Sequence, residues 1–437
     1  MKRILLIIVT ITTILVGCTN QPQELENVEL RILTFNGSEF NEKYGNFFIA
    51  THPNYTLHMI SIMENYTFGE NFNEVVEELI LTENPDVVSL NMDLYSSLLE
   101  QNKLSSLSPW IKKSKFDTSH FIPGIIDYFT DDQNQIHGLT PTFDGTALFY
   151  NKKMFTDNGI AFPKDSMTWR EVLQLAQRFP NLSDTNEQQF GYYDRKSENP
   201  FLMALNIGET NGLSFYYNDK FTFSSRSWEG VFQHVTDCFK SKVCYEKESL
   251  DTPSLSGITS LEKSNYPFLA GNIAMAIHDS SLYRTLTTSK DRFPDLEWGV
   301  VSVPISEEQE GLSNGVMMND ILSIPTSAGQ AVEAWELIEY IAGEDYARLL
   351  PNLRIEDLPA RLPSEWKDEN VKPFYELDRI TNTTINTLRS LPASVVTTMD
   401  EVPNKYIADI LSDRMGVPEA LRMIESELQK VHDVSDK

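Results

Sequence analysis

Residues 138–179 read GLTPTFDGTALFYNKKMFTDNGIAFPKDSMTWREVLQLAQRF, and this stretch decides the fold that the sequence predicts. The apolar run at 147–150 has the length of one buried strand. Asn151 can cap a short helix that extends through Phe155, and Asn158-Gly159 is a signal for that helix to end in a turn. The stretch therefore predicts a buried strand that leads directly into a helix.

A second helix is predicted after the loop at 163–167. Thr168 can cap its first turn, and Glu171 completes a capping box, in which each side chain accepts a backbone N–H of the other residue. The apolar face of this helix consists of Val172, Leu173, Leu175, Ala176 and Phe179.

The residues before this stretch alternate between strand and helix patterns. Strands are predicted at 28–35, 56–62 and 86–90, and an apolar pattern of helical period follows each of them. A β-α-β-α-β-α series folds most simply as a parallel sheet with helices on both faces.

Polar residues follow two of these strands and precede the strand at 147–150. Asn36 comes after the first strand, residues 91–93 come after the third, and Asp144 follows an extended segment broken by Pro141. In open α/β sheets, ligands bind at crossovers and outside the carboxyl ends of the strands. These residues are therefore candidates for a ligand-binding cleft.

The same stretch resembles family-1 extracellular solute-binding proteins, the sugar-binding lipoproteins of ABC importers that are related to maltose-binding protein. The resemblance rests on Tyr150-Asn151-Lys152, Phe155, Gly159, Pro163, Thr168-Trp169 and Glu171. Further segments that resemble the family lie at 84–88, 268–277, 297–304, 317–325, 331–342 and 416–421. Together the matches cover the chain from about residue 28 to 430.

The resemblance implies a two-lobed α/β fold, in which each lobe is a mixed, mostly parallel sheet flanked by helices. The first lobe would comprise residues 28–142 and 304–348, and the second residues 143–303 and 349–437. Asp144 would lie close to a hinge strand. The protein would act as a monomer, without cofactor or metal, and deliver a mono- or oligosaccharide to an ABC import permease.

Sugar recognition sets the chemistry expected of the cleft. Carboxylates accept hydrogen bonds from adjacent hydroxyls, and aromatic rings cover the apolar faces of a sugar. The resemblance places ligand contacts at Asn36, Ser38, Asp93, Asp144, Glu198, Asp279 and Ser281. A capping or solvated-loop role is the alternative for each acid.

The family often carries a stacking Trp after the strand at 273–277, and this chain has none there. Trp298, Trp169 and Trp366 are the other candidates. Trp169 also fits a structural role at the start of its helix.

The N-terminus has the pattern of a signal peptide at residues 1–17. Lys2 and Arg3 precede a mostly apolar run at 4–16, which is too short for a comfortable membrane span. The run ends in Leu15-Val16-Gly17-Cys18, which resembles a bacterial lipobox, in which the Cys is diacylated and becomes N-terminal. Residues 18–27 would then be a lipidated tether that holds the protein outside the cytoplasm on the bacterial cell membrane. An ordinary signal peptide with a chance Cys is the alternative.

The chain is strongly acidic. It has 36 Lys and Arg against 63 Asp and Glu, which gives a formal net charge of −27. This excess argues against binding to nucleic acid or to an anionic membrane surface. Solubility of a secreted protein is the simpler explanation of the charge.

Cys238 and Cys244 can form a disulfide outside the cytoplasm. On one continuous helix their Cα atoms would lie about 9 Å apart, which is beyond the reach of a disulfide. A bridge therefore requires the helix over 231–235 to end near Phe239, and the loop at 240–242 allows this. Two free thiols are the alternative.

Signatures of enzymes are weak. Residues 311–315 match G-x-S-x-G, but a nucleophile elbow needs a strand before the serine and a helix after it, whereas a charged loop and a strand-like segment flank this one. The sequence contains no P-loop, H-E-x-x-H or C-x-x-C motif. Two alternatives to a sugar receptor stay open: a secreted glycosidase, which needs two carboxylates about 5–9 Å apart, and a receptor for a non-sugar solute such as a peptide.

Replacing the lipobox cysteine tests the anchor. We expect Cys18→Ala to abolish lipidation and either to block processing or to release the protein, because the acylated residue is absent. Membrane fractionation and mass spectrometry of the N-terminus measure both effects. Unchanged membrane attachment with a normal acylated N-terminus would contradict the lipoprotein interpretation.

Overall fold

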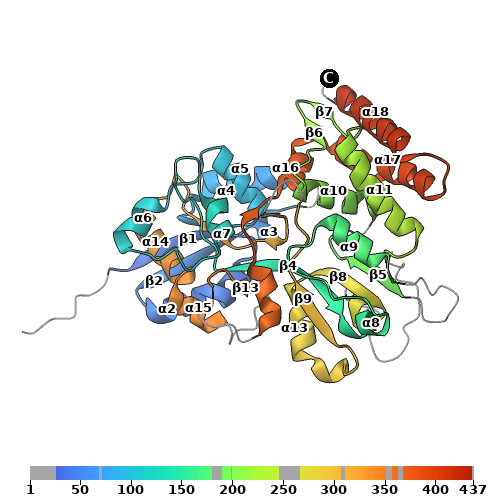
Figure 1. The fold of residues 1–437 in the computed structure, drawn as a ribbon. Coiled ribbons are helices and arrows are strands. Elements are labelled where there is room, and N and C mark those ends of the chain that lie inside the picture. The colour runs from blue at the N-terminus through green and yellow to red at the C-terminus, as the bar shows by residue number, and fades with distance from the viewer. Residues whose placement is uncertain are drawn as a thin grey trace, which may run out of the picture.

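The structure is a computed structural model that describes residues 26–67, 71–179, 189–197, 199–245, 266–306, 311–350, 357–362 and 368–435. Two lobes lie side by side, and strand β4 (Thr142–Asn151) lies between them (Figure 1). The predicted signal peptide and most of the predicted tether, including Cys18, lie outside the described ranges, as do Glu198 and Trp366.

The first lobe is built on a four-stranded sheet in the order β12-β3-β1-β2. Strands β1 (Val28–Thr34), β2 (Tyr55–Ser61) and β3 (Val87–Leu90) are parallel, as the β-α series predicts. Strand β12 (Ile321–Ser323) comes from much later in the chain and pairs antiparallel with β3. All residues of β3 are buried, so both faces of this sheet are covered.

Asparagine side chains start the helices that follow two of these strands. Asn36 caps α1 and Asn91 caps α5, each by accepting a backbone N–H from the first turn. The helical segments of this lobe are α1 (Gly37–Phe40), the π-helical η1 (Asn41–Gly45), α2 (Asn46–Thr51), α3 (Ile62–Asn65), α4 (Phe72–Glu83), α5 (Met92–Glu100), α6 (Ser108–Ser114), α7 (Pro123–Phe129), α14 (Ala331–Ile341) and α15 (Glu344–Leu349).

The second lobe is organised around β4. This strand pairs antiparallel with β8 (Ile273–Asp279), β9 (Trp298–Val301), β11 (Val316–Met317) and β13 (Leu358–Pro359), while β5 (Phe190–Asp194) runs parallel to β8. The sheet is mixed, as expected, but most of its strand pairs are antiparallel rather than parallel. The reason is that β4 leaves the first lobe and each of its partners runs back toward it.

Helices surround this second sheet and extend the lobe toward the C-terminus (Figure 1). They are α8 (Lys152–Asp157), α9 (Trp169–Ala176), α10 (Pro200–Thr210), α11 (Arg226–Lys240), η2 (Pro267–Ala270), α13 (Ser280–Thr288), η3 (Lys290–Arg292), η5 (Glu369–Tyr375), α16 (Thr383–Ser390), α17 (Ala393–Leu411) and α18 (Val417–Ser435). Two short two-stranded sheets pair β6 (Tyr216–Tyr217) with β7 (Lys220–Phe221) and β10 (Leu312–Ser313) with β14 (Arg379–Ile380).

The local signals in residues 138–179 are confirmed. Asn151 ends β4 and accepts the N–H of Met154 at 3.1 Å, which caps α8. Thr168 and Glu171 form the capping box of α9. Gly159 has a φ of +62°, a conformation that glycine adopts without strain, and it follows the end of α8.

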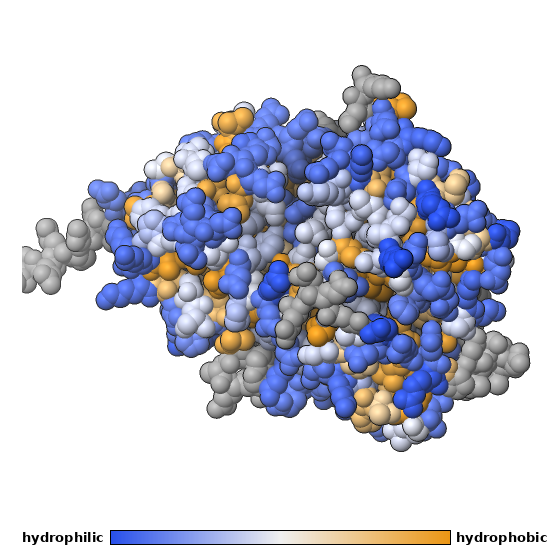
Figure 2. All heavy atoms as spheres, turned by 45° about the horizontal axis from the view of Figure 1, so that its top comes forward, coloured by the Kyte–Doolittle hydropathy of each residue, from blue (hydrophilic) through white to orange (hydrophobic). Residues whose placement is uncertain are grey.

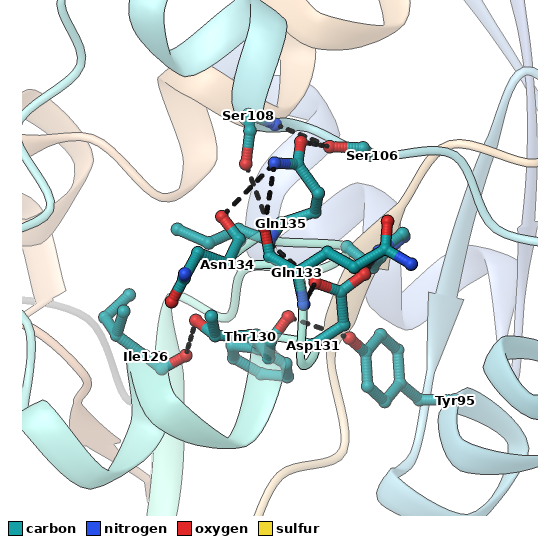
Figure 3. Close-up of polar contacts among 12 residues, drawn as sticks. Tyr95, Ser106, Ser108, Ile126, Thr130, Asp131, Gln133, Asn134 and Gln135 are labelled. Atoms are coloured by element: carbon teal, nitrogen blue, oxygen red, sulfur yellow. Dashed lines mark hydrogen bonds and ion pairs between the residues drawn. The ribbon is translucent and has the colours of Figure 1, made fainter.

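A polar turn holds the chain just before β4. Figure 3 shows Asp131 in this turn, where its carboxylate accepts the backbone N–H groups of Gln133 and Gln135, both at 2.8 Å. The Gln135 side chain in turn accepts a hydrogen bond from Ser106 at 2.9 Å. The turn thereby fixes the direction in which the chain enters the crossing between the lobes.

Three segments cross between the lobes side by side. Leu139 exchanges backbone hydrogen bonds with Leu322, and the N–H of Ala360 donates to the carbonyl of Pro141 at 2.9 Å. Just past β13, the guanidinium of Arg361 lies over the rings of Phe116 and Phe121, in the first lobe. Residues 357–362 therefore contact both lobes.

Cys238 and Cys244 are bridged, with an S–S distance of 2.09 Å. Helix α11 ends at Lys240, as a bridge over this spacing requires. Between the cysteines and β5, the N–H of Gly191 donates to the carbonyl of Val243 at 2.8 Å. The bridge thus ties the end of α11 to the edge of the second sheet.

Hydrophilic residues cover most of the face shown in Figure 2, and hydrophobic residues form separate small groups on it. None of the helices in the described ranges combines the length and the apolar character that a membrane span requires.

Two glycines on neighbouring helices give a matched test of the core. A methyl group on Gly208 of α10 would overlap the ring of Trp228, a buried residue of α11, whereas one on Gly230 of α11 would meet no atom within 4 Å. We expect Gly208→Ala to lower the free energy of unfolding by about 1–3 kcal/mol and Gly230→Ala to raise it by up to about 1 kcal/mol. Thermal unfolding measures both, and equal effects of the two substitutions would contradict this packing.

Candidate functional site

Two predicted acids meet where β4 begins and β8 ends. Thr146 of β4 pairs with Asp279, the last residue of β8, which brings Asp144 beside the start of α13. The Asp144 carboxylate accepts hydrogen bonds from the Ser280 hydroxyl at 2.8 Å and from the Ser280 N–H at 3.2 Å. Asp144 and Asp279 therefore lie at one site.

Both oxygens of Asp279 are held by protein groups. Oδ1 accepts the N–H of Ser281 at 3.1 Å and contacts Nδ1 of the buried His278 at 3.1 Å, and Oδ2 accepts from Nε of Arg195 at 2.7 Å. Asp279 also caps α13 through its bond to Ser281. Ser281 thus helps to position Asp279 as well as lying at the site.

The pKa values of the two carboxylates are shifted in opposite directions. Burial raises the pKa of Asp144 to about 6, and the charges of Asp279 and Asp357 add to the increase. Burial alone would raise the pKa of Asp279 too, but His278, Ser281 and Arg195 outweigh it, and the pKa of Asp279 is lowered. The site therefore holds a carboxylate that is fixed in its charged form beside one that resists ionisation.

A lysine that the sequence analysis missed lies among these acids. Lys196 follows β5 and donates from Nζ to the carbonyl of Asn314 at 3.0 Å. Enclosure by the protein lowers the pKa of Lys196, and the charges of four carboxylates oppose that decrease, namely Asp144, Asp194, Glu209 and Asp279. The sequence feature that could have indicated Lys196 is its position in Asp194-Arg195-Lys196, directly after an aromatic strand.

A chain of hydrogen bonds runs from this cluster toward α16. Asn206 donates to Asp194 at 3.3 Å, and Asn314 bonds to Asn206 and donates to Glu209 at 3.1 Å. Glu209 then accepts the N–H of Thr384 at 3.0 Å.

The first lobe presents different chemistry at its strand ends. Asn36 and Ser38 are exposed at the start of α1, and Asp93 lies in the first turn of α5, partly exposed. Next to Asn36, the Phe35 side chain is 51% exposed, and its ring lies 6.0 Å from that of Phe72. Phe35 therefore offers an exposed aromatic ring, which the sequence analysis did not single out.

The strand ends of the two lobes meet at the crossing. The N–H of Met92, just after β3, donates to the carbonyl of Met318 at 3.1 Å, and the adjacent Met317 pairs with Asp144. Farther out, Asn382 donates to the hydroxyl of Tyr128 at 3.2 Å, which joins α7 of the first lobe to the start of α16.

Comparison with known protein families identifies the family of this chain. A family described as bacterial extracellular solute-binding protein matches residues 61–359. The chain belongs to this family.

Solved structures of similar fold cover most of the chain. The sugar-binding protein MalE of Xanthomonas citri aligns with a TM-score of 0.66 at 16% identity, over 93% of this chain and 98% of that one. A sugar transporter of Rhizobium etli in an open conformation aligns with a TM-score of 0.62 at 16% identity, over 92% of this chain and 99% of that one. The fold is that of a two-lobed periplasmic binding protein.

Sequence similarity to curated relatives is confined to a short segment. Over 64 residues the solute-binding protein is 31% identical to the sn-glycerol-3-phosphate-binding periplasmic protein of Brucella abortus. The aligned segment spans 15% of this chain and 15% of the length of that relative.

Trp298 does not belong to the cluster of this solute-binding protein. It pairs with Asn151 at the opposite end of β4, seven positions from Asp144, or about 24 Å along the strand. There it packs near Phe149 and Tyr283. Trp169 is buried and donates to Thr210 at 2.8 Å, which is the structural role.

The G-x-S-x-G segment does not form a nucleophile elbow. Ser313 is buried in β10, its hydroxyl accepts the N–H of Gly315 at 3.0 Å, and the strand β11 follows where a helix would be needed. Among the residues that the structure describes, no three His, Cys, Asp or Glu side chains converge as metal ligands would.

The raised pKa of Asp144 predicts a stability difference that depends on pH. Its folded pKa of about 6 lies above the ordinary value of 3.8, so the contribution of this group is complete below about pH 4 and is lost as the pH rises through 6. We expect Asp144→Asn, which keeps an acceptor for Ser280, to become more stable than the wild type by up to about 3 kcal/mol at pH 7, with little difference at pH 4.

Denaturant unfolding at both pH values measures this difference. The exposed Asp157, which pairs with Lys153, provides the control Asp157→Asn, and we expect this variant not to gain stability at pH 7, because its carboxylate is not buried. A variant at position 144 that is less stable than the wild type at pH 7 would show that burial does not penalise the charge.

Proposed function

We propose that this protein binds a carbohydrate between its two lobes and delivers it to an ABC import permease. The observation that carries the proposal is that the strand ends of the two lobes present complementary groups, polar on one lobe and aromatic on the other. Asp144 and Lys196 offer an acceptor and a donor on the second lobe, beside the charged Asp279, and the exposed ring of Phe35 offers an apolar face on the first. A sugar has adjacent hydroxyls and an apolar C–H face, which these groups complement.

The charge of the cluster favours a neutral ligand. Asp144, Asp194, Glu209 and Asp279 surround the ammonium of Lys196, and Asp279 pairs with Arg195. A phosphate would therefore meet cations that are already paired with carboxylates. For this reason we do not extend to this chain the ligand in the name of the glycerol-phosphate-binding relative. Structural neighbours include a sugar transporter and a sugar-binding protein, which agrees with the proposal.

Delivery requires a signal that the site is occupied. A ligand that touches both lobes binds the closed form better, and only this difference in affinity can shift the equilibrium between open and closed forms. The closed form would then present both lobes together to the permease. The lipobox at Cys18 supports the further proposal that the receptor is anchored to the outer face of the cell membrane.

A glycosidase is the second candidate, because its acid and its nucleophile also need separated pKa values. Asp144 and Asp279 show that separation. However, both oxygens of Asp279 accept hydrogen bonds, from Ser281 and from Arg195, which leaves it poorly placed to attack a sugar. The receptor is therefore the better-supported function.

An oligosaccharide library analysed by native mass spectrometry separates the two candidates. A retained, intact sugar supports the receptor, and cleaved products support the enzyme. Calorimetry with a retained sugar then tests the site: we expect Asp144→Ala to weaken binding about 10- to 100-fold, because a charged acceptor is lost. Asp144→Asn should retain part of the affinity, because its carbonyl still accepts.

Asp157→Ala, on the surface of α8, is the matched control for loss of a carboxylate and should bind as the wild type does. If the 144 and 157 variants bind equally well, Asp144 is not part of the site. If no sugar in the library is retained, the carbohydrate proposal is wrong.

A further inference from the structure

A cavity lies next to the carboxylate cluster, between α10, the short β10–β14 sheet and α16. Its volume is about 520 Å³. Sites that hold small molecules measure about 300–1,000 Å³. The lining residues that matter here are Glu209, Leu312, Arg379, Thr381, Thr384 and Thr387.

The lining suits a neutral, hydroxylated molecule. Five of the lining residues carry hydroxyl groups, and Leu312 and Ile380 add apolar surface. Within the described residues, the hydroxyls of Thr384 and Thr387 make no hydrogen bond to a protein group. They are therefore available to a ligand.

Charge in the cavity is already balanced. Glu209 is 7% exposed, and its carboxylate accepts the Thr384 N–H at 3.0 Å and the Thr383 hydroxyl at 3.2 Å. That carboxylate occupies the N-terminus of α16, which would otherwise attract an anion. Arg379 is the cation that lines the same cavity. An anionic ligand is accordingly disfavoured.

Glu209 also connects the cavity to the candidate site. Its other carboxylate oxygen accepts from Asn314 at 3.1 Å, and the Asn314 carbonyl accepts from Lys196 at 3.0 Å. Lys196 in turn faces Asp144 and Asp279. The cavity and the cluster thus share one hydrogen-bonded wall.

We infer that this cavity is a second subsite for the same ligand, so that the protein selects carbohydrates of two or more linked units over monosaccharides. The inference rests on the proposed function. One unit binds at Asp144 and Lys196, and the next extends along Asn314 and Glu209 toward Thr384 and Thr387.

The test compares chain lengths. Oligomers of one to four units, in series of α-1,4-linked glucose and of β-1,4-linked glucose, xylose and N-acetylglucosamine, are titrated into the wild type by calorimetry. In the series that binds, we expect affinity to rise at least 10-fold from the shortest to the longest member. Thr384→Val and Thr387→Val should each lower the affinity for the long member about 2- to 10-fold and leave the shortest unchanged.

Thr397→Val is the matched control, because Thr397 is an exposed helical threonine of α17 outside the cavity. Unchanged binding of the shortest member shows that the variants are folded. Affinity that is independent of chain length, or an equal effect of the control, overturns the second subsite while the proposed function stands. If no series binds the wild type, the proposed function fails and the subsite with it.

Discussion

The backbone pairing of β4 is the constraint on which the rest of the structure depends. A strand in the middle of a sheet must pair along both edges, because an unpaired buried N–H or C=O is costly. Near the hinge, β4 meets this requirement with β11 and β13, which cross between the lobes. Farther along the strand, β4 pairs with β8 and β9. The same strand therefore builds the hinge and the floor of the second lobe, and Asp144 lies where the two meet.

The electrostatics of the site follow from that placement. Asp144 is enclosed beside another acid because the pairing of β4 with β8 is fixed by the sheet, and its raised pKa reflects this enclosure. Lys196 and Arg195 compensate for part of the charge without leaving the site neutral. A polar but uncharged ligand can donate hydroxyl hydrogen bonds to these carboxylates and displace water from them. Stability given up at Asp144 is thus consistent with a residue that serves binding.

Local features could be predicted from the sequence, and features that depend on distant segments could not. The strand over 147–150 and the caps at Asn151 and Thr168 are set by neighbouring residues, so the pattern predicts them. Lys196 was missed because the acids around it come from Asp144, Glu209 and Asp279, which are far apart in sequence. Trp298 was misplaced because the register between β9 and β4, which no local pattern encodes, decides at which end of the strand it lies.

The central claim is that a ligand held between the lobes changes how the lobes are arranged. Small-angle scattering of the protein with and without a saturating sugar from the library tests it most directly, because the radius of gyration reports the separation of the lobes. The account predicts a smaller radius of gyration in the presence of the sugar. A sugar that binds tightly and leaves the scattering curve unchanged would contradict it.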